Sequence, residues 1–422
     1  MQRSIGIALF GLLALLLGSI SAGVIWCILQ IMELGIELVW FWIPEQLGMI
    51  DRLLYNVSVC LLGGLLIGLW QRRYGVLPDN MHQVMKRIKC TGGYPYDRFL
   101  IIMVAALMPL IFGGAIGPEA GLSGLIAGLC TLVGDRLKYK GDRLAAMAET
   151  GFAAALSVIF GAPLFGIIGN LEPDNRNETY RKKLVSKKSR IFIYCMGVIG
   201  GIFTIRALNI VAGADGGLPR FSRNYGIGIE QWKWAVPLVA AGLMTALIFI
   251  LMDRITGYIG YKLRNYKVIS CLIAGGILSV LGYYVPLGMF SGEAQMTELM
   301  EGWMNFSFGM LLLVACVKMF LVNTCINLGW RGGNIFPMIF SGVAVGYAVA
   351  LAIKMGCGME LDGSFAVAMV VSAMCGYIMR KPATVVAVLL LCFPVTYMIP
   401  IGATAFVTSK IPSIRGKQEL SA

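Results

Sequence analysis

The chain has 422 residues, of which 58% are hydrophobic and only 14% are charged. This composition excludes an ordinary soluble domain, in which about a quarter of the residues carry a charge. The net charge of +13 lies in short loops between apolar segments, which argues for a topology signal and against a nucleic-acid partner. The eleven cysteines are scattered without a C-x-x-C pair, and there is one histidine. We therefore predict reduced, buried thiols, and neither a metal site nor a cofactor.

Apolar segments fill most of the chain. Some are long enough for a full membrane span of about 20 residues, whereas others are short or broken by glycine and proline. Broken helices are tolerated in a bilayer only where protein or a water-filled cavity satisfies their backbone groups. We predict an all-α integral membrane protein with many tilted and broken transmembrane helices. In chain order the segments cover residues 5–32, 56–70, 99–133, 144–171, 192–212, 233–252, 268–287, 308–328, 334–353, 364–379 and 383–408.

Basic residues gather in some connecting loops and are sparse in others. The loops at 43–51, 210–224 and 286–301 are poor in lysine and arginine. Cytoplasmic loops of membrane proteins carry an excess of these residues. We therefore place the basic loops in the cytoplasm and the multi-pass chain in the inner (cytoplasmic) cell membrane. The basic loops contain Arg72 and Arg73, Lys86 to Lys89, Arg136 to Arg143, Arg181 to Arg190, and Arg254 to Lys267.

One short phrase occurs twice in the chain. Residues 113–118 read GGAIGP and residues 332–337 read GGNIFP, and a further proline, Pro163 or Pro382, follows each at the same distance. The matching register predicts two related membrane halves, residues 1–225 and 226–422. Paired glycine and proline interruptions in two halves are a strong sequence pointer to a transporter binding site. The alternative is that the phrases only mark two kinked, tightly packed helices.

The charges that follow the two phrases predict how the halves are related. The first phrase is followed by the basic cluster at 136–143, which we place inside. The second is followed by Lys354, Glu360 and Asp362 without a basic cluster, so we place that end outside. Matching segments would then cross the membrane in opposite directions. This arrangement is an inverted repeat with its axis in the membrane plane.

Each phrase has the features of an anion-binding helix end. Glycine lets backbone amides approach a ligand closely, and proline suits the first turn of a helix. A helix that begins at midplane offers free N–H groups and the positive end of its dipole. Two such ends from opposite leaflets would bind an anion without a full positive charge. The phrases therefore predict a site for a small monovalent anion that binds weakly enough to leave again.

Four spaced elements at 114–118, 160–166, 333–337 and 380–382 resemble, in order, signatures of one known family. They are similar to the G-[KR]-E-G-P, asparagine-alanine-proline, G-x-F-x-P and arginine-alanine-proline elements of the CLC chloride channels and proton/chloride antiporters. The resemblance extends over residues 60–410. It implies an inverted-repeat CLC-like fold in the lipid bilayer, assembled as a homodimer with one pathway per subunit. It also implies transport of chloride or a similar halide, not an enzymatic reaction.

In the family, backbone amides of the two phrases coordinate the permeating anion. The resemblance therefore assigns this role to a set of amides in each phrase of the present chain. They are Gly114, Ala115, Ile116 and Gly117 in the first half, and Gly333, Asn334, Ile335 and Phe336 in the second.

The family's gating glutamate, the third residue of its first signature, falls on Ile116 here. In a competing register, residues 117–121 (GPEAG) would make Glu119 the gate. Because the internal repeat pairs Pro118 with Pro337, we prefer Ile116. That register places Glu119 about one turn further into the helix. There it would cap free amides or act as a displaced gate.

Other family positions are altered as well. The inner glutamate that relays protons in the antiporters falls on Pro173, which cannot carry a proton, and Glu172 precedes it as a candidate for the proton path. Residues 75–78 (GVLP) replace the serine-containing G-S-G-I-P element. Residues 410–413 (KIPS) offer no counterpart of the pathway tyrosine. The chain therefore resembles a divergent bacterial branch.

Three functions remain open on these residues. The first is channel-like conduction of a small monovalent anion such as chloride. The second is proton-coupled exchange of chloride or fluoride, with Glu119 or Glu172 as the carboxylate. The third, an intramembrane enzyme, would need clustered carboxylates, a nucleophile with a base or metal ligands, and it ranks last. Arg331 would either favour anion entry or pair with an acidic neighbour. The chain ends shortly after Pro412, so we expect no cytoplasmic regulatory domain.

Overall fold

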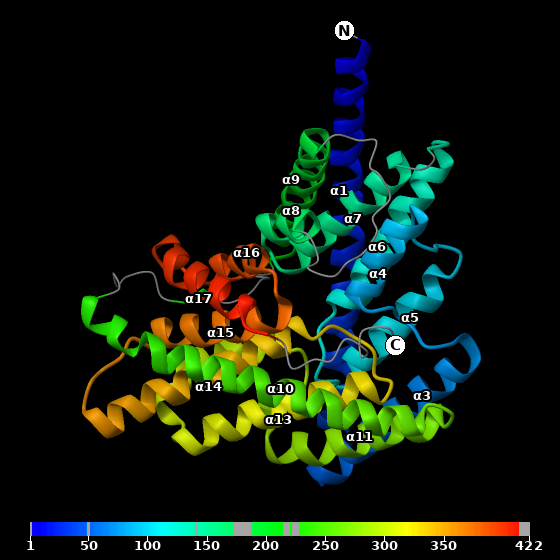
Figure 1. Ribbon diagram of the computed structural model, residues 1–422. Helices are drawn as coiled ribbons and strands as arrows, with labels where there is room; N and C mark the ends of the chain where they lie inside the picture. The colour runs from blue at the N-terminus through cyan, green and yellow to red at the C-terminus, as the bar shows by residue number, and fades with distance from the viewer. Residues whose placement is uncertain are drawn as a thin grey trace.

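The computed structural model describes residues 2–48, 51–139, 142–172, 187–213, 220–221 and 228–412. These residues are almost entirely helical and contain no named strand, which confirms the predicted all-α class. The predicted boundary between the two halves, at residue 225, lies outside the described residues. Figure 1 shows the helices in chain order.

The N-terminal half of the sequence supplies nine α-helices within its described part. They are α1 (Gln2–Glu37), α2 (Ile43–Leu47), α3 (Arg52–Tyr74), α4 (Met81–Thr91), α5 (Phe99–Ile111), α6 (Glu119–Arg136), α7 (Asp142–Ile159), α8 (Pro163–Leu171) and α9 (Lys187–Ala212). The C-terminal half supplies eight more in its described part. They are α10 (Ala235–Leu263), α11 (Lys267–Tyr284), α12 (Glu293–Gly302), α13 (Phe308–Asn327), α14 (Ile335–Cys357), α15 (Gly363–Met379), α16 (Pro382–Cys392) and α17 (Met398–Lys410).

Helix lengths vary as the broken apolar pattern predicts. Within the described residues, seven segments are long and apolar enough to cross a membrane. Three further apolar helices, α5, α15 and α16, are shorter. Full-length spans and shorter apolar helices are therefore both present in the described part of the chain. The seven segments are Leu9–Leu47, Arg52–Tyr74, Lys188–Ala212, Glu230–Leu263, Lys267–Tyr284, Phe308–Asn327 and Ile335–Cys357.

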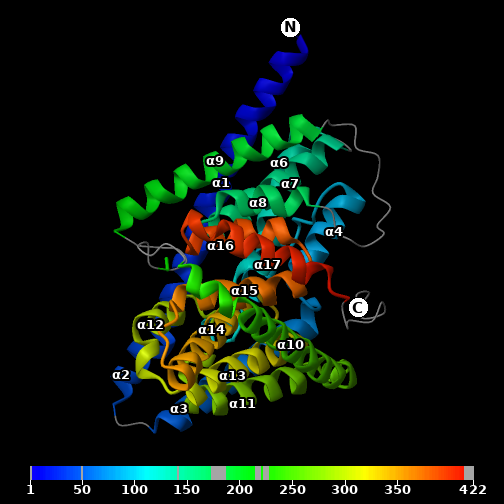
Figure 2. The same ribbon diagram turned by 60° about the vertical axis from the view of Figure 1, so that its left-hand side comes forward.

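The packing in one half has a counterpart in the other. Helix α5 packs on α6 and α7 packs on α9, while α13 packs on α14 and α15 packs on α17. The helices that open with the matched prolines, α8 and α16, pack against each other, as do α3 and α11. Figures 1 and 2 show α1 and α9 together at one end of the molecule, with α10, α11, α13 and α14 at the other.

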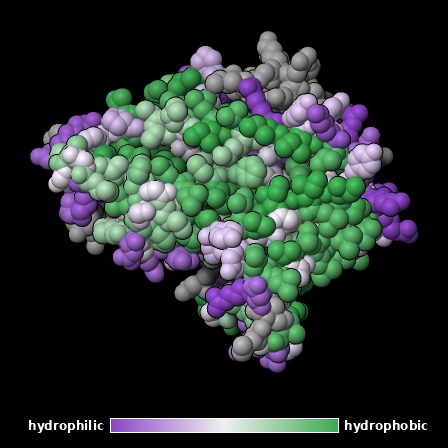
Figure 3. All heavy atoms as spheres, turned by 90° about the horizontal axis from the view of Figure 1, so that it is seen from below, coloured by the Kyte–Doolittle hydropathy of each residue, from purple (hydrophilic) through white to green (hydrophobic). Residues whose placement is uncertain are grey.

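The surface is unusually apolar. Seen from below, a broad hydrophobic area covers the molecule, with polar residues mainly toward its periphery (Figure 3). Large contiguous apolar patches on a protein surface mark places that contact other molecules or lipid. The side chains of Phe203, Ile210 and Val211 on α9 and of Val236 on α10 are among the most exposed apolar groups. They suit contact with a bilayer.

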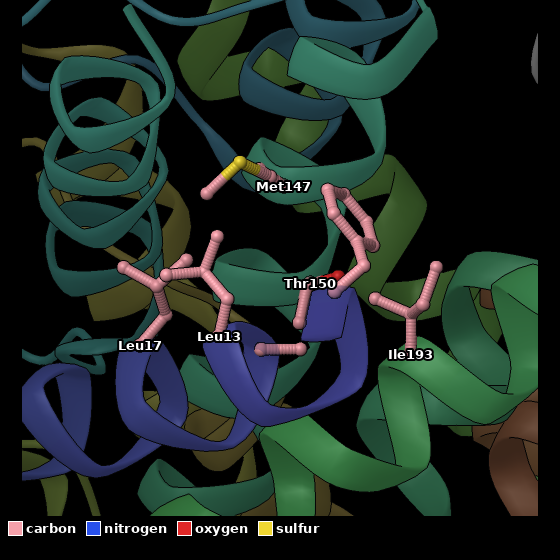
Figure 4. Close-up of a pocket in the computed structure, with 7 residues that line it drawn as sticks. Leu13, Leu17, Met147, Thr150 and Ile193 are labelled. Atoms are coloured by element: carbon pink, nitrogen blue, oxygen red, sulfur yellow. The ribbon is translucent and has the colours of Figure 1, made fainter. Parts of the chain in front are cut away.

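A narrow crevice lies between α1, α7 and α9, and it leaves no room for a water molecule. Leu13 and Leu17 of α1, Met147 and Thr150 of α7 and Ile193 of α9 face it (Figure 4). Its lining is almost wholly apolar, and neither repeated phrase contributes to it. The crevice is therefore separate from the region in which the phrases meet.

Close contact between α1 and α9 depends on glycine. A Cβ atom on Gly18 of α1 would overlap the carbonyl group of Gly197 of α9. Gly23, on the same helix, has no neighbouring atom within 4 Å of the corresponding position. Small residues at such crossings let two membrane helices approach closely and gain van der Waals contact.

We predict that Gly18→Ala lowers stability and Gly23→Ala does not. Overpacking at a tight contact costs about 1–3 kcal/mol, whereas alanine in place of an unconstrained helical glycine gains about 0.5–1 kcal/mol. Thermal unfolding midpoints in detergent would measure both variants. A Gly18→Ala protein as stable as Gly23→Ala would show that α1 and α9 do not pack in this way.

Candidate functional site

The two repeated phrases meet in space. Gly117 and Gly333 form an isolated antiparallel pair. The N–H of Gly117 donates to the oxygen of Gly333 at 2.8 Å, and the N–H of Gly333 donates to the oxygen of Gly117 at 2.7 Å. A side chain on either residue would collide with the carboxyl group of Glu119. The two glycines therefore leave room for that group in its present position.

A helix begins beside each member of this pair. The first helical bonds run from Leu122 N–H to the Pro118 oxygen at 3.1 Å and from Met338 N–H to the Asn334 oxygen at 3.0 Å. Helix α6 accordingly starts at Glu119, and α14 starts at Ile335. Pro337 lies in the first turn of α14, as predicted, while Pro118 directly precedes α6.

The sequence register placed Glu119 about one turn into its helix, but the structure places it earlier. It is the first residue of α6. The N–H and oxygen of Gly117 are both bonded to Gly333, so they do not take part in a first helical turn, and α6 begins after them. The correction places the Glu119 side chain at the junction of the two phrases.

The carboxylate of Glu119 occupies the N-terminal end of α14. Its Oε1 accepts a hydrogen bond from the Ile335 N–H at 2.8 Å. Its Oε2 is buried without a hydrogen-bond partner among the described residues, and the whole residue is only 1% exposed. A helix N-terminus attracts negative charge through its free amides and its dipole. The side chain thus holds the position at which the sequence predicted an anion.

Several of the eight predicted anion-binding amides are engaged within the protein. Gly114 N–H donates to the Pro109 oxygen, and Ile116 N–H donates to the Gly114 oxygen, both at 2.8 Å. The Gly117 amide donates to the Gly333 oxygen, and the Gly333 amide donates to the Gly117 oxygen. The Ile335 amide donates to the Glu119 carboxylate. The Phe336 amide also acts on the Glu119 carboxyl group, and the Ala115 amide acts on the Cys325 thiol. Anion binding by these groups stays a prediction.

The two gate candidates lie against neighbouring glycines of the second phrase. The side chain of Ile116 is fully buried against Gly332, and that of Glu119 covers Gly333. Both therefore sit at the meeting point of the phrases, but only Glu119 brings a charge to it.

Aromatic rings connect this junction to the first matched proline. The ring of Phe336, the second residue of α14, stacks on that of Phe160 with centroids 4.5 Å apart. Phe160 also contacts Phe165 edge to face at 4.7 Å. Because Phe160 and Phe165 flank Pro163, the element at 160–166 packs directly on the start of α14.

Glu172, the candidate for a proton path, caps another helix. Its carboxylate accepts hydrogen bonds from the N–H groups of Ala383 at 3.2 Å and Thr384 at 2.8 Å, and from the Thr384 hydroxyl at 2.5 Å. These groups open α16, which begins at Pro382. The arrangement joins the end of α8 to the start of α16. Pro173 lies outside the described residues.

Two buried ionisable groups escaped the sequence reasoning. Lys318 of α13 is fully buried, and its Nζ donates to the backbone oxygens of Met289 at 2.8 Å and Phe290 at 2.7 Å. Glu149 of α7 is also buried and forms an ion pair with Arg190 of α9, alongside a hydrogen bond from the Tyr194 hydroxyl. Each stands alone in an apolar segment, and such intramembrane charges are a signal of function or of a specific contact.

Arg331, directly before the second phrase, is partly buried, and its Nε has no hydrogen-bond partner among the described residues. Asp79, a neighbouring acid, is already engaged with Arg87 at 3.2 Å and with the Tyr94 hydroxyl at 3.0 Å. The charge of Arg331 therefore lies close to the second phrase without a salt bridge in the described part of the chain.

The match to a known family decides how this arrangement is classified. Residues 63–413 match the family described as "Voltage gated chloride channel". The chain belongs to this family. The predicted resemblance to CLC proteins is thereby confirmed, and with its apolar helices the chain is a multi-pass membrane protein.

Relatives of known sequence align with most of the chain. The "Putative ion-transport protein YfeO" of Escherichia coli O17:K52:H18 is 24% identical over 372 residues, and the alignment covers 83% of each chain. The protein of the same name from Escherichia coli O7:K1 is 23% identical with the same coverage.

Solved structures of the family share the fold. A slow cyanobacterial Cl⁻/H⁺ antiporter has a TM-score of 0.78 at 16% identity, with 96% of this chain and 93% of that one covered. A CLC-type fluoride/proton antiporter has a TM-score of 0.69 at 16% identity, with coverage of 96% and 95%. These similarities confirm the CLC-like arrangement of tilted and broken helices.

We predict that Glu172→Ala destabilises the protein, because it removes the cap of α16. Loss of a capping side chain costs about 0.5–2 kcal/mol. Unfolding in detergent would measure the change, and Glu172→Gln should lose less because its amide oxygen still accepts a hydrogen bond. Glu360→Ala, which removes a carboxylate from an exposed pair with Lys354, is the control. Equal stability of Glu172→Ala and Glu360→Ala would contradict a capping role.

Proposed function

We propose that this chain carries a small monovalent anion, chloride first among them, across the inner membrane, and that Glu119 is its gate. The observation that carries the proposal is the Glu119 carboxylate bound to the Ile335 amide at the start of α14. A site that binds a carboxylate through a helix N-terminus also suits a small anion of the same charge. Gate and transported anion would compete for one position.

Protonation would decide this competition. An ionised Glu119 is attracted by the positive end of α14, whereas a neutral one is not. Acidification therefore weakens the hold on the side chain and frees the Ile335 amide for the anion. Conduction should rise as the pH falls through the range in which Glu119 gains its proton. The matching glycines leave the space into which the anion would enter once the carboxyl group moves.

The inner side of the pathway favours channel-like conduction. The position of the antiporters' inner glutamate is a proline in this chain, and the adjacent Glu172 is engaged with the start of α16. Both of its carboxylate oxygens accept hydrogen bonds from the first residues of that helix. Proton-coupled exchange of chloride or fluoride is the second candidate, supported by the antiporters that share this fold.

We further infer that the two halves form an inverted repeat and that two copies of the chain assemble as a homodimer, each with its own pathway. The antiparallel pairing of Gly117 with Gly333 supports the repeat, as does the contact between the matched helices α8 and α16. The dimer is inferred from the family resemblance.

We predict that Glu119→Gln abolishes the pH dependence of anion flux and leaves the pathway open at neutral pH. A neutral amide side chain has no charge for the start of α14 to attract and does not titrate, so it competes more weakly with the anion at every pH. Flux from reconstituted vesicles, measured with chloride and with fluoride from pH 5 to 8, would test this. Glu360→Gln, which alters an exposed carboxylate, should retain the wild-type profile.

The same vesicles separate the two candidate mechanisms. Under a chloride gradient, channel-like conduction produces no uphill proton movement, whereas exchange does. Proton uptake driven by the anion gradient would overturn the channel-like assignment in favour of exchange. A Glu119→Gln profile with unchanged pH dependence would remove Glu119 as the gate.

We predict that Ile116→Glu lowers flux at neutral pH by roughly tenfold or more, since a second buried carboxylate in the junction repels anions over a short distance in a medium of low polarity. Ile116→Leu keeps the apolar contact with Gly332 and should conduct as the wild type does. Vesicle flux at neutral and acidic pH would measure both. Unaltered flux in Ile116→Glu would place Ile116 outside the pathway.

A further inference from the structure

The chain directly before the second phrase is fixed at one end of the molecule. The Trp330 indole N–H donates to the Cys271 oxygen at 3.0 Å. The side-chain amide of Gln71 donates to the Gly329 oxygen. Cys271 lies near the start of α11 and Gln71 near the end of α3. The second phrase therefore begins beside two helix ends that come from distant parts of the sequence.

These two helix ends carry basic residues. Helix α3 runs into Arg72 and Arg73, which are both exposed, and α11 follows the basic segment 254–267. The Lys267 ammonium donates to the Gln71 oxygen at 3.4 Å, so the two ends lie against each other. Basic loops of membrane proteins face the cytoplasm. We therefore expect the start of the second phrase to lie on the cytoplasmic side of the junction.

Arg331 links this end of the molecule to the junction of the two phrases. An extended chain advances at most about 3.6 Å per residue, so the Cα atom of Arg331 lies within about 7 Å of that of Gly333. Gly333 is the residue that pairs with Gly117. Arg331, Gly332 and Asn334 are partly exposed, whereas the first phrase is buried throughout. The accessible groups of the junction therefore belong to the second phrase, and Arg331 lies next to them.

The guanidinium of Arg331 lacks an internal partner. Its Nε is buried and has no hydrogen-bond partner among the described residues, and none of the salt bridges found there includes Arg331. Asp79 is an acid whose charge acts on Arg331, but it is bonded to Arg87 and to the Tyr94 hydroxyl. A buried donor without a partner is costly. An anion that accepts from this guanidinium would remove that cost.

The chemistry of arginine suits an ion that must leave again. The guanidinium stays protonated at any physiological pH, and its delocalised charge is more weakly hydrated than an ammonium. Because the residue is partly exposed, water screens its attraction for a halide. Such a site raises the local anion concentration without holding the ion tightly, as transport requires.

We propose that Arg331 is an anion-binding side chain at the cytoplasmic mouth of the pathway. Its guanidinium N–H groups hold chloride or a similar halide before the ion enters the junction, or after it leaves. This inference rests on the proposed function, in which the anion passes through the meeting point of the two phrases. It assigns to the mouth a site made by a charged side chain, separate from the backbone amides at the start of α14.

The test varies chloride on the cytoplasmic side of oriented vesicles, with the outer chloride and the ionic strength held constant. Arg331→Gln keeps N–H donors but removes the charge. A single opposite charge a few ångströms away in water changes affinity by about fivefold. The half-saturating cytoplasmic chloride concentration should rise by about that factor, while the maximal flux and the outer half-saturating concentration keep their wild-type values. Arg331→Lys retains the charge and should restore most of the affinity.

Arg72→Gln is the matched control, because it removes an exposed arginine from the same end of the molecule. Charges more than about 8–10 Å away are largely screened at physiological ionic strength, so this variant should keep the wild-type half-saturation. The wild-type protein gives a second measurement that needs no variant to fold. Raising the ionic strength with a large impermeant anion should weaken cytoplasmic chloride binding more than outer binding.

Several results would overturn the role of Arg331. They are an unchanged cytoplasmic half-saturation in Arg331→Gln, a lower maximal flux without a change in half-saturation, and equal sensitivity of the two sides to ionic strength. Failure of the proposed function has a different signature, because wild-type vesicles would then carry no anion at all. Anion flux that is present and unaffected by Arg331→Gln removes only this inference.

Discussion

Gly117 and Gly333, two glycines from distant parts of the chain, form two reciprocal backbone hydrogen bonds. Unpaired backbone groups are costly inside a membrane protein, so the reciprocal pair lets both phrases leave helical structure at the same place. The absence of side chains leaves room beside the pair, and the Glu119 carboxyl group fills it. The starts of α6 and α14, the burial of Glu119 and its bond to Ile335 all depend on this contact.

Several charged side chains bind backbone groups and not opposite charges. Glu119 and Glu172 each bind the amides at the start of a helix, and Lys318 binds two carbonyl oxygens at the end of a loop. A helix end can hold a charge without presenting a full counter-charge, so an ion that replaces the side chain is not bound too tightly to leave. The ion pair of Glu149 with Arg190 differs, and it joins α7 to α9 away from the phrases. The first arrangement suits exchange of ligands, and the second suits a permanent contact.

Much of the fold follows from sequence patterns that reflect a single physical requirement. Apolar segments must be helical in a bilayer, and glycine or proline marks where a helix is interrupted. The interruptions at 113–118 and 332–337 therefore indicated the junction, and the elements at Pro163 and Pro382 indicated two further helix starts. The details of the site were harder to predict from the sequence. The register argument set Ile116 against Glu119, but it placed Glu119 a turn too far into α6, because it could not include the pairing of Gly117 with Gly333. Lys318 was visible as a lone charge in an apolar segment, although its acceptors lie in another part of the sequence.

Composition and local spacing were enough to indicate the membrane class, the duplicated phrase and the family signatures. The engaged amides, the side chain at the start of α14 and the capping of α16 by Glu172 became visible in the folded chain. The physical reason is that hydrogen bonding and charge repulsion act between atoms that the fold brings within a few ångströms, while the residues that carry them are far apart along the chain.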